Sequence, residues 1–243
     1  ARPLRSISSA AVPHDLESAY RLQRAIGAAF GEARGWKISG LTPAQQHDMG
    51  VECPLAAPLL ADWTHDSGAA FVLQGFIKPR LECEFAFELG ADVPPRDAPY
   101  VRAEVEAAIL ALRIGVEVVD SRLPTGSPVL LELADDLNNG AYVIGPATMQ
   151  WQAVRPATQS IALHRRHAGN DEIIAAGDGR AILEGDLVGA LLLLANLPAL
   201  KPRGLRSGDV VTTGSCTGAV PVPGPGDYQA DFGSLGSVHL RFS

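Results

Sequence analysis

The stretch PRLECEFAFELG, residues 79–90, alternates apolar and polar side chains. The apolar positions are Leu81, Cys83, Phe85, Phe87 and Leu89. This period of two predicts a β-strand with one face in a core. The opposite face carries two carboxylates, Glu82 and Glu84, because residues i and i+2 of a strand point to the same side. A pair of acids in mid-strand needs an explanation.

A third acid, Glu117, lies in the apolar stretch IGVEVVD, residues 114–120, which also reads as a strand. Acids inside apolar strands are disfavoured by propensity and by desolvation. Three carboxylates from two strands form the kind of oxygen site that Mg²⁺ or Mn²⁺ prefers. The same residues also fit a solvent-exposed strand face that binds nothing. The pattern alone leaves both interpretations open.

Two further residues are candidates for acid–base chemistry. Lys37 lies between Trp36 and Ile38 in GWKISGL, and a partly buried lysine with a lowered pKa serves as an acid or a base. The alternative is a lysine whose ammonium group reaches solvent. Asp62 closes the apolar run LLADW, where a helix cap is the alternative role.

The composition narrows the function classes. The chain has 243 residues, 47% hydrophobic and 19% charged, which predicts one large globular domain, or one domain with a small extension. A formal net charge of −7 argues against nucleic acids and anionic membranes as partners. Three cysteines without a CxxC motif argue against a disulfide framework and favour a reducing cytoplasm. The longest apolar run, residues 188–200, is interrupted by Asn196 and Pro198 and is too short to span a bilayer.

Helical and strand periodicities alternate along the chain without βαβ repetition, which predicts an α+β fold. We expect helices over residues 14–30, 102–112 and 186–197, and a short helix that begins at Thr42 with Pro43 at its first position and Gln45 completing a capping box. Residues 113–120 are expected to form a strand, and residues 159–176 a hairpin.

The order of several motifs resembles the fumarylacetoacetate hydrolase superfamily, in particular its 2-keto-4-pentenoate hydratase and 4-oxalocrotonate decarboxylase branch. The motifs are DLESAYRLQ, GWKISGLT, MGVECPLAAPLLAD, PRLECEFAFELG, VEVVDSR, ADDLNNGAYVIGP, GDVVTTGS and GDYQADFGSLGSVHLRF. The resemblance implies a mixed β-sandwich roll with flanking helices, often as a homo-oligomer. It also implies an N-terminal helical cap segment, residues 1–68, packed on a β-rich catalytic domain, residues 69–243.

The resemblance also implies roles for particular residues. Glu82, Glu84 and Glu117 match the family's ligands for Mg²⁺ or Mn²⁺, and Lys37 and Asp62 match its catalytic lysine and aspartate. The positions at the substrate pocket are Asn139, Gly140, Thr213 and Ser215.

The implied activity is hydration of a 2-hydroxy-2,4-dienoate to a 4-hydroxy-2-oxo acid in the catabolism of aromatic compounds. Decarboxylation of 2-oxo-3-hexenedioate is an alternative, as is hydrolysis of an acylpyruvate, for which His14 and Glu17 would supply a dyad one helical turn apart. A non-catalytic family member is the third alternative, motivated by departures from the family pattern at Ser39, Asn139 and Asp186.

Overall fold

The computed structural model describes residues 2, 4 and 6–243. Its α-helices are α1 (Leu16–Gly27), α2 (Pro43–Met49), α3 (Arg102–Ala108), α4 (Val129–Ala134) and α5 (Leu187–Ala195). The first seven strands are β1 (Ala33–Ser39), β2 (Leu55–Leu60), β3 (Thr64–Asp66), β4 (Ala69–Phe71), β5 (Arg80–Leu89), β6 (Ile109–Val119) and β7 (Asn139–Thr148). The remaining strands are β8 (Ser160–His167), β9 (Asn170–Asp178), β10 (Val210–Ser215), β11 (Val220–Pro221), β12 (Gly226–Asp231) and β13 (Ser237–Phe242).

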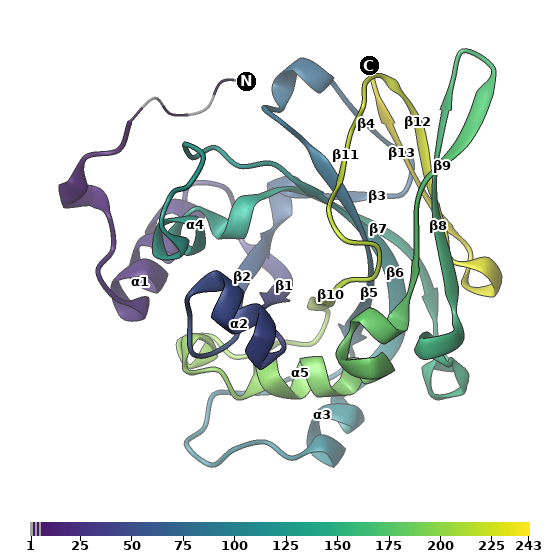
Figure 1. The fold of residues 1–243 in the computed structure, drawn as a ribbon. Coiled ribbons are helices and arrows are strands. Elements are labelled where there is room, and N and C mark those ends of the chain that lie inside the picture. Colours follow the sequence, from purple (N-terminus) through teal and green to yellow (C-terminus); the bar gives the residue numbers. More distant parts are fainter. Residues whose placement is uncertain (1, 3, 5) are drawn as a thin grey trace.

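Two sheets organise the fold, as the sequence predicted for an α+β roll. The larger sheet has the strand order β2-β1-β10-β5-β6-β7-β3, with β11 paired to β5, and the smaller has the order β4-β13-β12-β8-β9. Figure 1 shows the larger sheet strongly curled, with the smaller sheet on one side and α1, α2 and α4 on the other. The curl brings side chains from distant strands of the larger sheet together over one face.

The predicted strand at residues 79–90 is confirmed as β5, near the middle of the larger sheet. Its five alternate apolar side chains are no more than 1% exposed. Phe85 meets Phe232 edge-to-face with ring centroids 5.5 Å apart, a contact between the sheets. Because this face is committed to the core, the glutamate face of β5 is turned the other way.

The helix predicted over residues 102–112 ends earlier, because α3 stops at Ala108 and β6 starts at Ile109. Leu112 pairs with Phe87 across the β5–β6 ladder, and Leu112 is 2% exposed. Pairing with a buried neighbouring strand outweighs the helical spacing of this segment. The short helix at Thr42 is confirmed, since Thr42 Oγ1 accepts from the Gln45 amide and Gln45 Oε1 accepts from the Thr42 amide.

The segment 1–68 contains more than helices. Its strands β1, β2 and β3 all belong to the larger sheet, and β10, from the last fifth of the chain, lies between β1 and β5. These N-terminal strands belong to the sheet because they are buried in it: every residue of β2 is buried, and β2 pairs with β1 along nearly its whole length. Residues on both sides of position 68 therefore build one sheet.

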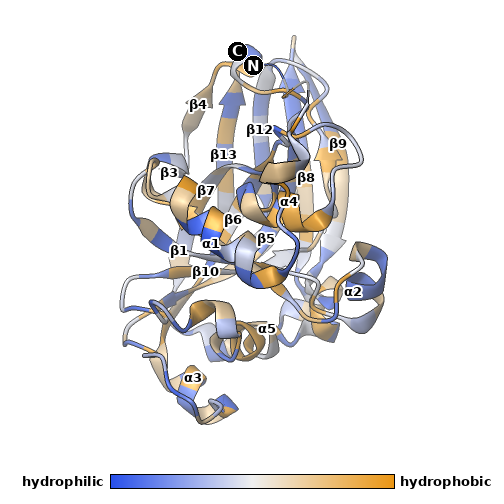
Figure 2. Ribbon diagram, turned by 90° about the vertical axis from the view of Figure 1, so that its left-hand side faces the viewer, coloured by the Kyte–Doolittle hydropathy of each residue, from blue (hydrophilic) through white to orange (hydrophobic). Residues whose placement is uncertain are grey.

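Helix α5 closes the lower end of the core in Figure 1. Its leucine-rich sequence gives the apolar colours of its turns in Figure 2, and five of its nine residues are buried. None of the helices in the described part of the chain is both long and apolar enough to cross a membrane.

Candidate metal and substrate site

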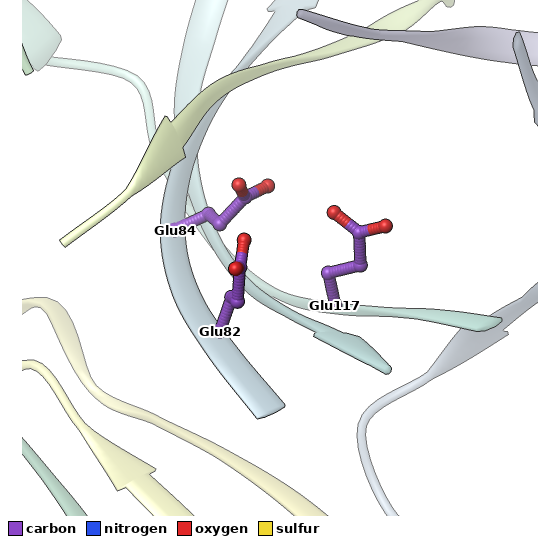
Figure 3. Close-up of side chains that lie close together, drawn as sticks. All are labelled: Glu82, Glu84 and Glu117. Atoms are coloured by element: carbon purple, nitrogen blue, oxygen red, sulfur yellow. The ribbon is translucent and has the colours of Figure 1, made fainter. Parts of the chain in front are cut away.

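Three glutamates converge on the concave side of the larger sheet. Glu82 and Glu84 come from β5, and Glu117 on β6 is paired directly opposite Glu82. One carboxylate oxygen from each residue lies within 4.8 Å of the others, and Figure 3 shows the three side chains pointing toward one another. Glu84 and Glu117 are each 2% exposed, so they do not form a solvated strand face. Of the two interpretations that the sequence left open, the geometry favours a cation site.

The absence of a side chain at residue 115 shapes this cluster. Gly115 on β6 is paired with Glu84, and a Cβ atom there would lie 2.1 Å from the hydroxyl oxygen of Tyr142. Tyr142 on β7 is paired with Glu117 and is 1% exposed. Gly115 thus leaves the space that the phenol occupies beside the glutamates.

Burial makes the three carboxylates costly without a cation. Burial and the neighbouring Glu117 raise the pKa of Glu82 to about 7. Burial, Glu117 and Glu82 together raise the pKa of Glu84 well above its usual range. Within the described chain, Glu84 Oε2 has no hydrogen-bond partner. The donor set of three carboxylates, one with an unpartnered oxygen, fits a hard divalent cation such as Mg²⁺ or Mn²⁺.

Lys37 reaches the cluster from β1. Its Nζ donates to Glu117 Oε1 and to the carbonyl oxygen of Leu137, the latter at 3.1 Å. Burial alone would lower the pKa of Lys37, but the adjacent Glu117, with Glu82 and Glu84 beyond it, raises that pKa on balance. The lowered pKa that the sequence suggested is therefore wrong for the metal-free protein, in which Lys37 is a buried cation.

A strained turn presents the Leu137 carbonyl. Asp136, Leu137 and Asn138 have φ angles of 62°, 51° and 62°, and residues other than glycine pay roughly 1–3 kcal/mol for such a conformation. Arg122 holds both ends of the turn by donating to the carbonyl oxygens of Asp135, at 2.9 Å, and Asn139, at 2.8 Å.

Within this turn, Asp136 is a buried carboxylate, 4% exposed, and neither of its oxygens has a hydrogen-bond partner in the described chain. Burial raises the pKa of Asp136 to about 7, while the charges of Lys37 and Arg122 act against that rise. The turn thus places a further buried carboxyl group near Lys37, besides those of the glutamate cluster.

A cavity of about 510 Å³ opens above these groups. Lys37 and the three glutamates line it together with backbone and side chains from the 136–138 turn, α2 and β10. The volume suits a small organic acid rather than a polymer.

The structure separates the sequence-predicted residues into two groups. Lys37, Glu82, Glu84, Glu117 and Ser215 line the cavity. The others are placed elsewhere: Asp62, Asn139, Gly140 and Thr213.

Asp62 lies exposed in the 3-10 turn Ala61–Trp63, with a carboxylate oxygen 3.4 Å from where a Cβ of Gly31 would be. Thr213 is fully buried, and its hydroxyl donates to the Phe85 carbonyl at 3.0 Å. Asn139 is 1% exposed at the start of β7. In their place, the adjacent residues Asn138 and Gly214 line the cavity.

The residues that depart from the family pattern also fall into two groups, inside and outside the cavity. Ser39 lines the cavity, whereas Asp186 caps α5 by accepting from the Gly189 amide at 3.0 Å and pairs with Arg102. His14, offered for a hydrolase dyad, has an 82% exposed side chain that contacts Asp15. Neither Asp186 nor His14 is among the cavity residues.

Several cavity residues gave no sequence signal of their own. Asp48, Arg80 and Glu132 line it, and Asp136 lies within the strained turn beside it. Only the run DDLNN hinted at such a turn, because aspartate and asparagine tolerate positive φ better than most residues.

Comparisons with known proteins agree with this architecture. No family model matches the chain. The TodF product hydratase of Pseudomonas putida strain F1 is 31% identical over 238 residues, covering 94% of this chain and 85% of that protein. The 4-oxalocrotonate decarboxylase of Pseudomonas putida is 31% identical over 219 residues, covering 87% of this chain and 80% of that protein.

Solved structures resemble the fold closely. The 4-oxalocrotonate decarboxylase from Pseudomonas putida G7, complexed with magnesium and adipate, superposes with a TM-score of 0.81 at 25% identity, over 94% of this chain and 86% of that one. Fumarylpyruvate hydrolase from Pseudomonas aeruginosa, in complex with Mn²⁺ and pyruvate, shares the fold with a TM-score of 0.57 at 17% identity, over 87% and 89% of the two chains. With the two relatives above 30% identity, these matches show that the chain belongs to the family of the 2-keto-4-pentenoate hydratases and 4-oxalocrotonate decarboxylases, and that it has the fold of solved structures in the fumarylacetoacetate hydrolase family.

Proposed function

We propose that this protein is a divalent-metal-dependent hydro-lyase that converts a 2-hydroxy-2,4-dienoate into a 4-hydroxy-2-oxo acid. The observation that carries the proposal is the convergence of Glu82, Glu84 and Glu117 beside buried Lys37 at the cavity. Support also comes from the hydratase relatives, among them 2-keto-4-pentenoate hydratase 1 of Dechloromonas aromatica at 29% identity over 94% of this chain.

Glu82, Glu84 and Glu117 would hold Mg²⁺ or Mn²⁺. Such a cation, when bound, supplies Lewis-acid stabilisation of negative charge on the oxygens of a 2-oxo acid. The chain's own contribution is to orient the substrate in the cavity and to move protons.

Lys37 is the group we assign to proton transfer. Among the residues that the structure describes, it is the one lysine lining the cavity, and its Nζ is held from two sides by Glu117 and the Leu137 carbonyl. During hydration a proton leaves the 2-hydroxyl oxygen, carbon 5 gains a proton, and water then adds its oxygen to carbon 4 and a proton to carbon 3. A positioned acid or base contributes about 10²–10⁴ in rate to steps of this kind.

Asp136 completes this assignment as a positioning residue. Its carboxyl group lies near Lys37 but not on the cavity surface, so it acts on the ammonium group rather than on substrate. We assign no proton transfer to Asp62, which lies exposed outside the cavity.

The test is a direct assay with fresh 2-hydroxypenta-2,4-dienoate and Mg²⁺. Loss of the dienoate's ultraviolet band, with 4-hydroxy-2-oxopentanoate as the product, is the expected result. Metal-stripped enzyme and the Glu84→Gln variant serve as controls and should be inactive. A dienoate spectrum that stays unchanged with metal-loaded wild-type enzyme would overturn the proposal.

Decarboxylation is the second candidate, favoured by the 31% identity to 4-oxalocrotonate decarboxylase. It uses the same three glutamates but a substrate with a second carboxylate. Release of CO₂ from 2-oxo-3-hexenedioate distinguishes it from hydration.

The proposal includes a cytoplasmic location and a homo-oligomeric state. The three cysteines are unpaired in the structure, which suits a reducing compartment. Light scattering coupled to gel filtration tests the oligomeric state.

A further inference from the structure

Three buried polar atoms on the glutamate face have no hydrogen-bond partner among the described residues. They are Oε2 of Glu84 and the hydroxyl oxygens of Tyr142 on β7 and Thr212 on β10. All three residues are buried, so bulk solvent does not reach these atoms in place of a partner. Because buried polar groups in folded proteins are nearly always hydrogen-bonded, two donors and one acceptor left over on one face need an explanation.

The hydroxyl of Tyr142 lies beside Glu84 because residue 115 is glycine. Tyr142 is paired with Glu117 across the β6–β7 ladder, and the Cβ atom that Gly115 lacks would lie 2.1 Å from the Tyr142 hydroxyl oxygen. The phenol therefore crosses β6 diagonally over residue 115. Gly115 is itself paired with Glu84, and paired residues of an antiparallel ladder point to the same side with Cα atoms about 4.5–5.5 Å apart. The hydroxyl thus ends next to the Glu84 side chain.

Thr212 approaches Glu84 from the opposite neighbour of β5. It is paired with Ala86, and residues 84 and 86 share one face of β5. Thr212 is therefore a diagonal neighbour of Glu84 across the β5–β10 ladder. Burial raises the pKa of Glu84 most strongly, and the nearby Thr212 hydroxyl acts in the opposite direction. The Glu84 carboxylate thus lies between two hydroxyls, one from each side of its strand.

Neither hydroxyl belongs to the surface of the cavity. Glu84 lines the cavity, whereas Tyr142 and Thr212 do not, so both approach the carboxylate from the side turned away from a substrate. A group in this position acts through Glu84, by donating a hydrogen bond to a carboxylate oxygen. Hydrogen bonds of this kind orient metal-binding side chains, and their loss typically weakens metal affinity or activity by about 10–100-fold.

We propose that Tyr142 and Thr212 are positioning residues for the metal site, which donate hydrogen bonds to the Glu84 carboxylate and hold it in one orientation when the cation is bound. Hydrogen bonds to an ionised carboxylate are roughly twice as strong as those between neutral groups, so this acceptor suits two otherwise unpartnered donors. The inference rests on the metal site of the proposed function but not on the reaction.

The test measures Mn²⁺ binding to the full chain by electron paramagnetic resonance. Tyr142→Phe keeps the ring over Gly115 and removes only the hydroxyl. We expect the dissociation constant of Mn²⁺ to rise by about tenfold or more, and the line shape of the bound ion to change, because the Glu84 carboxylate is no longer held in one orientation. Thr212→Val replaces the second hydroxyl by a methyl group and should raise the dissociation constant by about three- to tenfold.

Tyr228→Phe is the matched control. Tyr228 on β12 of the smaller sheet is as deeply buried as Tyr142, and its hydroxyl donates to the Gly224 carbonyl at 2.6 Å. Losing that bond should lower the free energy of unfolding but leave the affinity and line shape of Mn²⁺ as in wild type. Tyr142→Phe should show the reverse, with weaker Mn²⁺ binding and nearly wild-type unfolding in EDTA, because no described residue bonds its hydroxyl. A purely structural role would not produce that reversal.

The outcomes are separable from those of the proposed function. Unchanged Mn²⁺ affinity and line shape in one variant remove that residue from the assignment, and unchanged values in both overturn the inference. Complete loss of Mn²⁺ binding in Tyr142→Phe, as expected for Glu84→Gln, also overturns it, because Tyr142 would then be a ligand itself. Weakened binding with wild-type unfolding supports the inference even if the dienoate is not hydrated, a result that overturns the hydratase alone. Wild-type protein that binds no Mn²⁺ overturns both.

Discussion

Lys37 on β1 and Glu117 on β6 form an ion pair that is almost closed to solvent, with side chains 8% and 2% exposed. The two strands are separated by β10 and β5 in the sheet order, and the pair forms because the sheet is curled. Glu117 thus pairs with the ammonium group of Lys37 and would also bind the cation that it shares with Glu82 and Glu84. The predictions below follow from that shared carboxylate.

Removing one ligand charge should abolish cation binding. Glu82→Gln or Glu84→Gln keeps the side-chain shape but removes an anionic oxygen, so Mn²⁺ affinity and Mg²⁺-dependent turnover should both be lost. Mn²⁺ binding is measured by electron paramagnetic resonance, and circular dichroism checks the fold. Glu17→Gln should bind the cation as wild type does. Retained affinity in both glutamate variants would contradict the three-carboxylate site.

Cation binding should stabilise the protein. The three crowded glutamates cannot all ionise at low cost in the metal-free state, so a cation that binds only the folded chain raises the melting temperature by linkage. Thermal unfolding in EDTA and in millimolar Mg²⁺ or Mn²⁺ measures the difference. K⁺ at matched ionic strength is the control. A melting temperature indifferent to both divalent cations would argue against the site.

Lys37→Met separates chemistry from binding. Methionine keeps the aliphatic stem but carries no proton, so kcat should fall by about 10²–10⁴ while the affinity for oxalate is retained. If Lys37 only attracts the substrate carboxylate, KM rises and kcat changes little. Unchanged kcat removes Lys37 from the catalytic assignment.

The same variant should show how much the buried ion pair contributes to the free energy of unfolding. Losing Lys37 leaves Glu117 buried and unpaired, and breaking such pairs typically costs about 3–5 kcal/mol. The loss should be largest in EDTA and smaller with Mg²⁺, because the cation then neutralises Glu117. Chemical denaturation of Lys37→Met under the two conditions measures it, and an equal loss in both would contradict the shared role of Glu117.

Asp136 should make the metal-free protein less stable as pH rises. Its pKa is raised from 3.8 to about 7 by burial, so the folded state holds a proton that the unfolded chain releases between those values. The stabilising contribution is therefore full below the unfolded pKa and is lost as pH rises through about 7, by about 2–3 kcal/mol between pH 5 and pH 7.

The Asp136→Asn variant isolates that contribution. Asparagine keeps the shape, suits the positive φ, and does not titrate, so the decline in unfolding free energy between pH 5 and pH 7 should be shallower than in wild type. Urea denaturation in EDTA at the two pH values measures both slopes. The Asp97→Asn variant, at a fully exposed carboxylate, is the control and should show the wild-type slope. A variant slope as steep as that of wild type would assign the titration to other groups.

Local patterns in the sequence were sufficient to predict the strand that carries Glu82 and Glu84 and the capped helix at Thr42. They also supported the conclusion that acids inside apolar strands need a partner. Each of these depends on neighbours within a few residues, where a period of two or a capping box is a direct consequence of backbone geometry. The order of motifs added the family, and with it Lys37 and Glu117 as members of one site.

Only the tertiary structure decided which of those residues meet and what surrounds them. Lys37 and Glu117 are 80 residues apart and adjoin because the sheet curls, and the length of α3 was decided by the pairing of β6 with β5. Asp136 gave no periodic signal, because its position depends on a strained turn that Arg122 holds from outside the turn. The sequence offers Asp62 as a candidate site residue on the same grounds as Lys37, yet Asp62 lies exposed on the surface. Sequence spacing specifies which face of a strand a side chain takes, whereas the long-range packing of strands from both ends of the chain determines which faces converge.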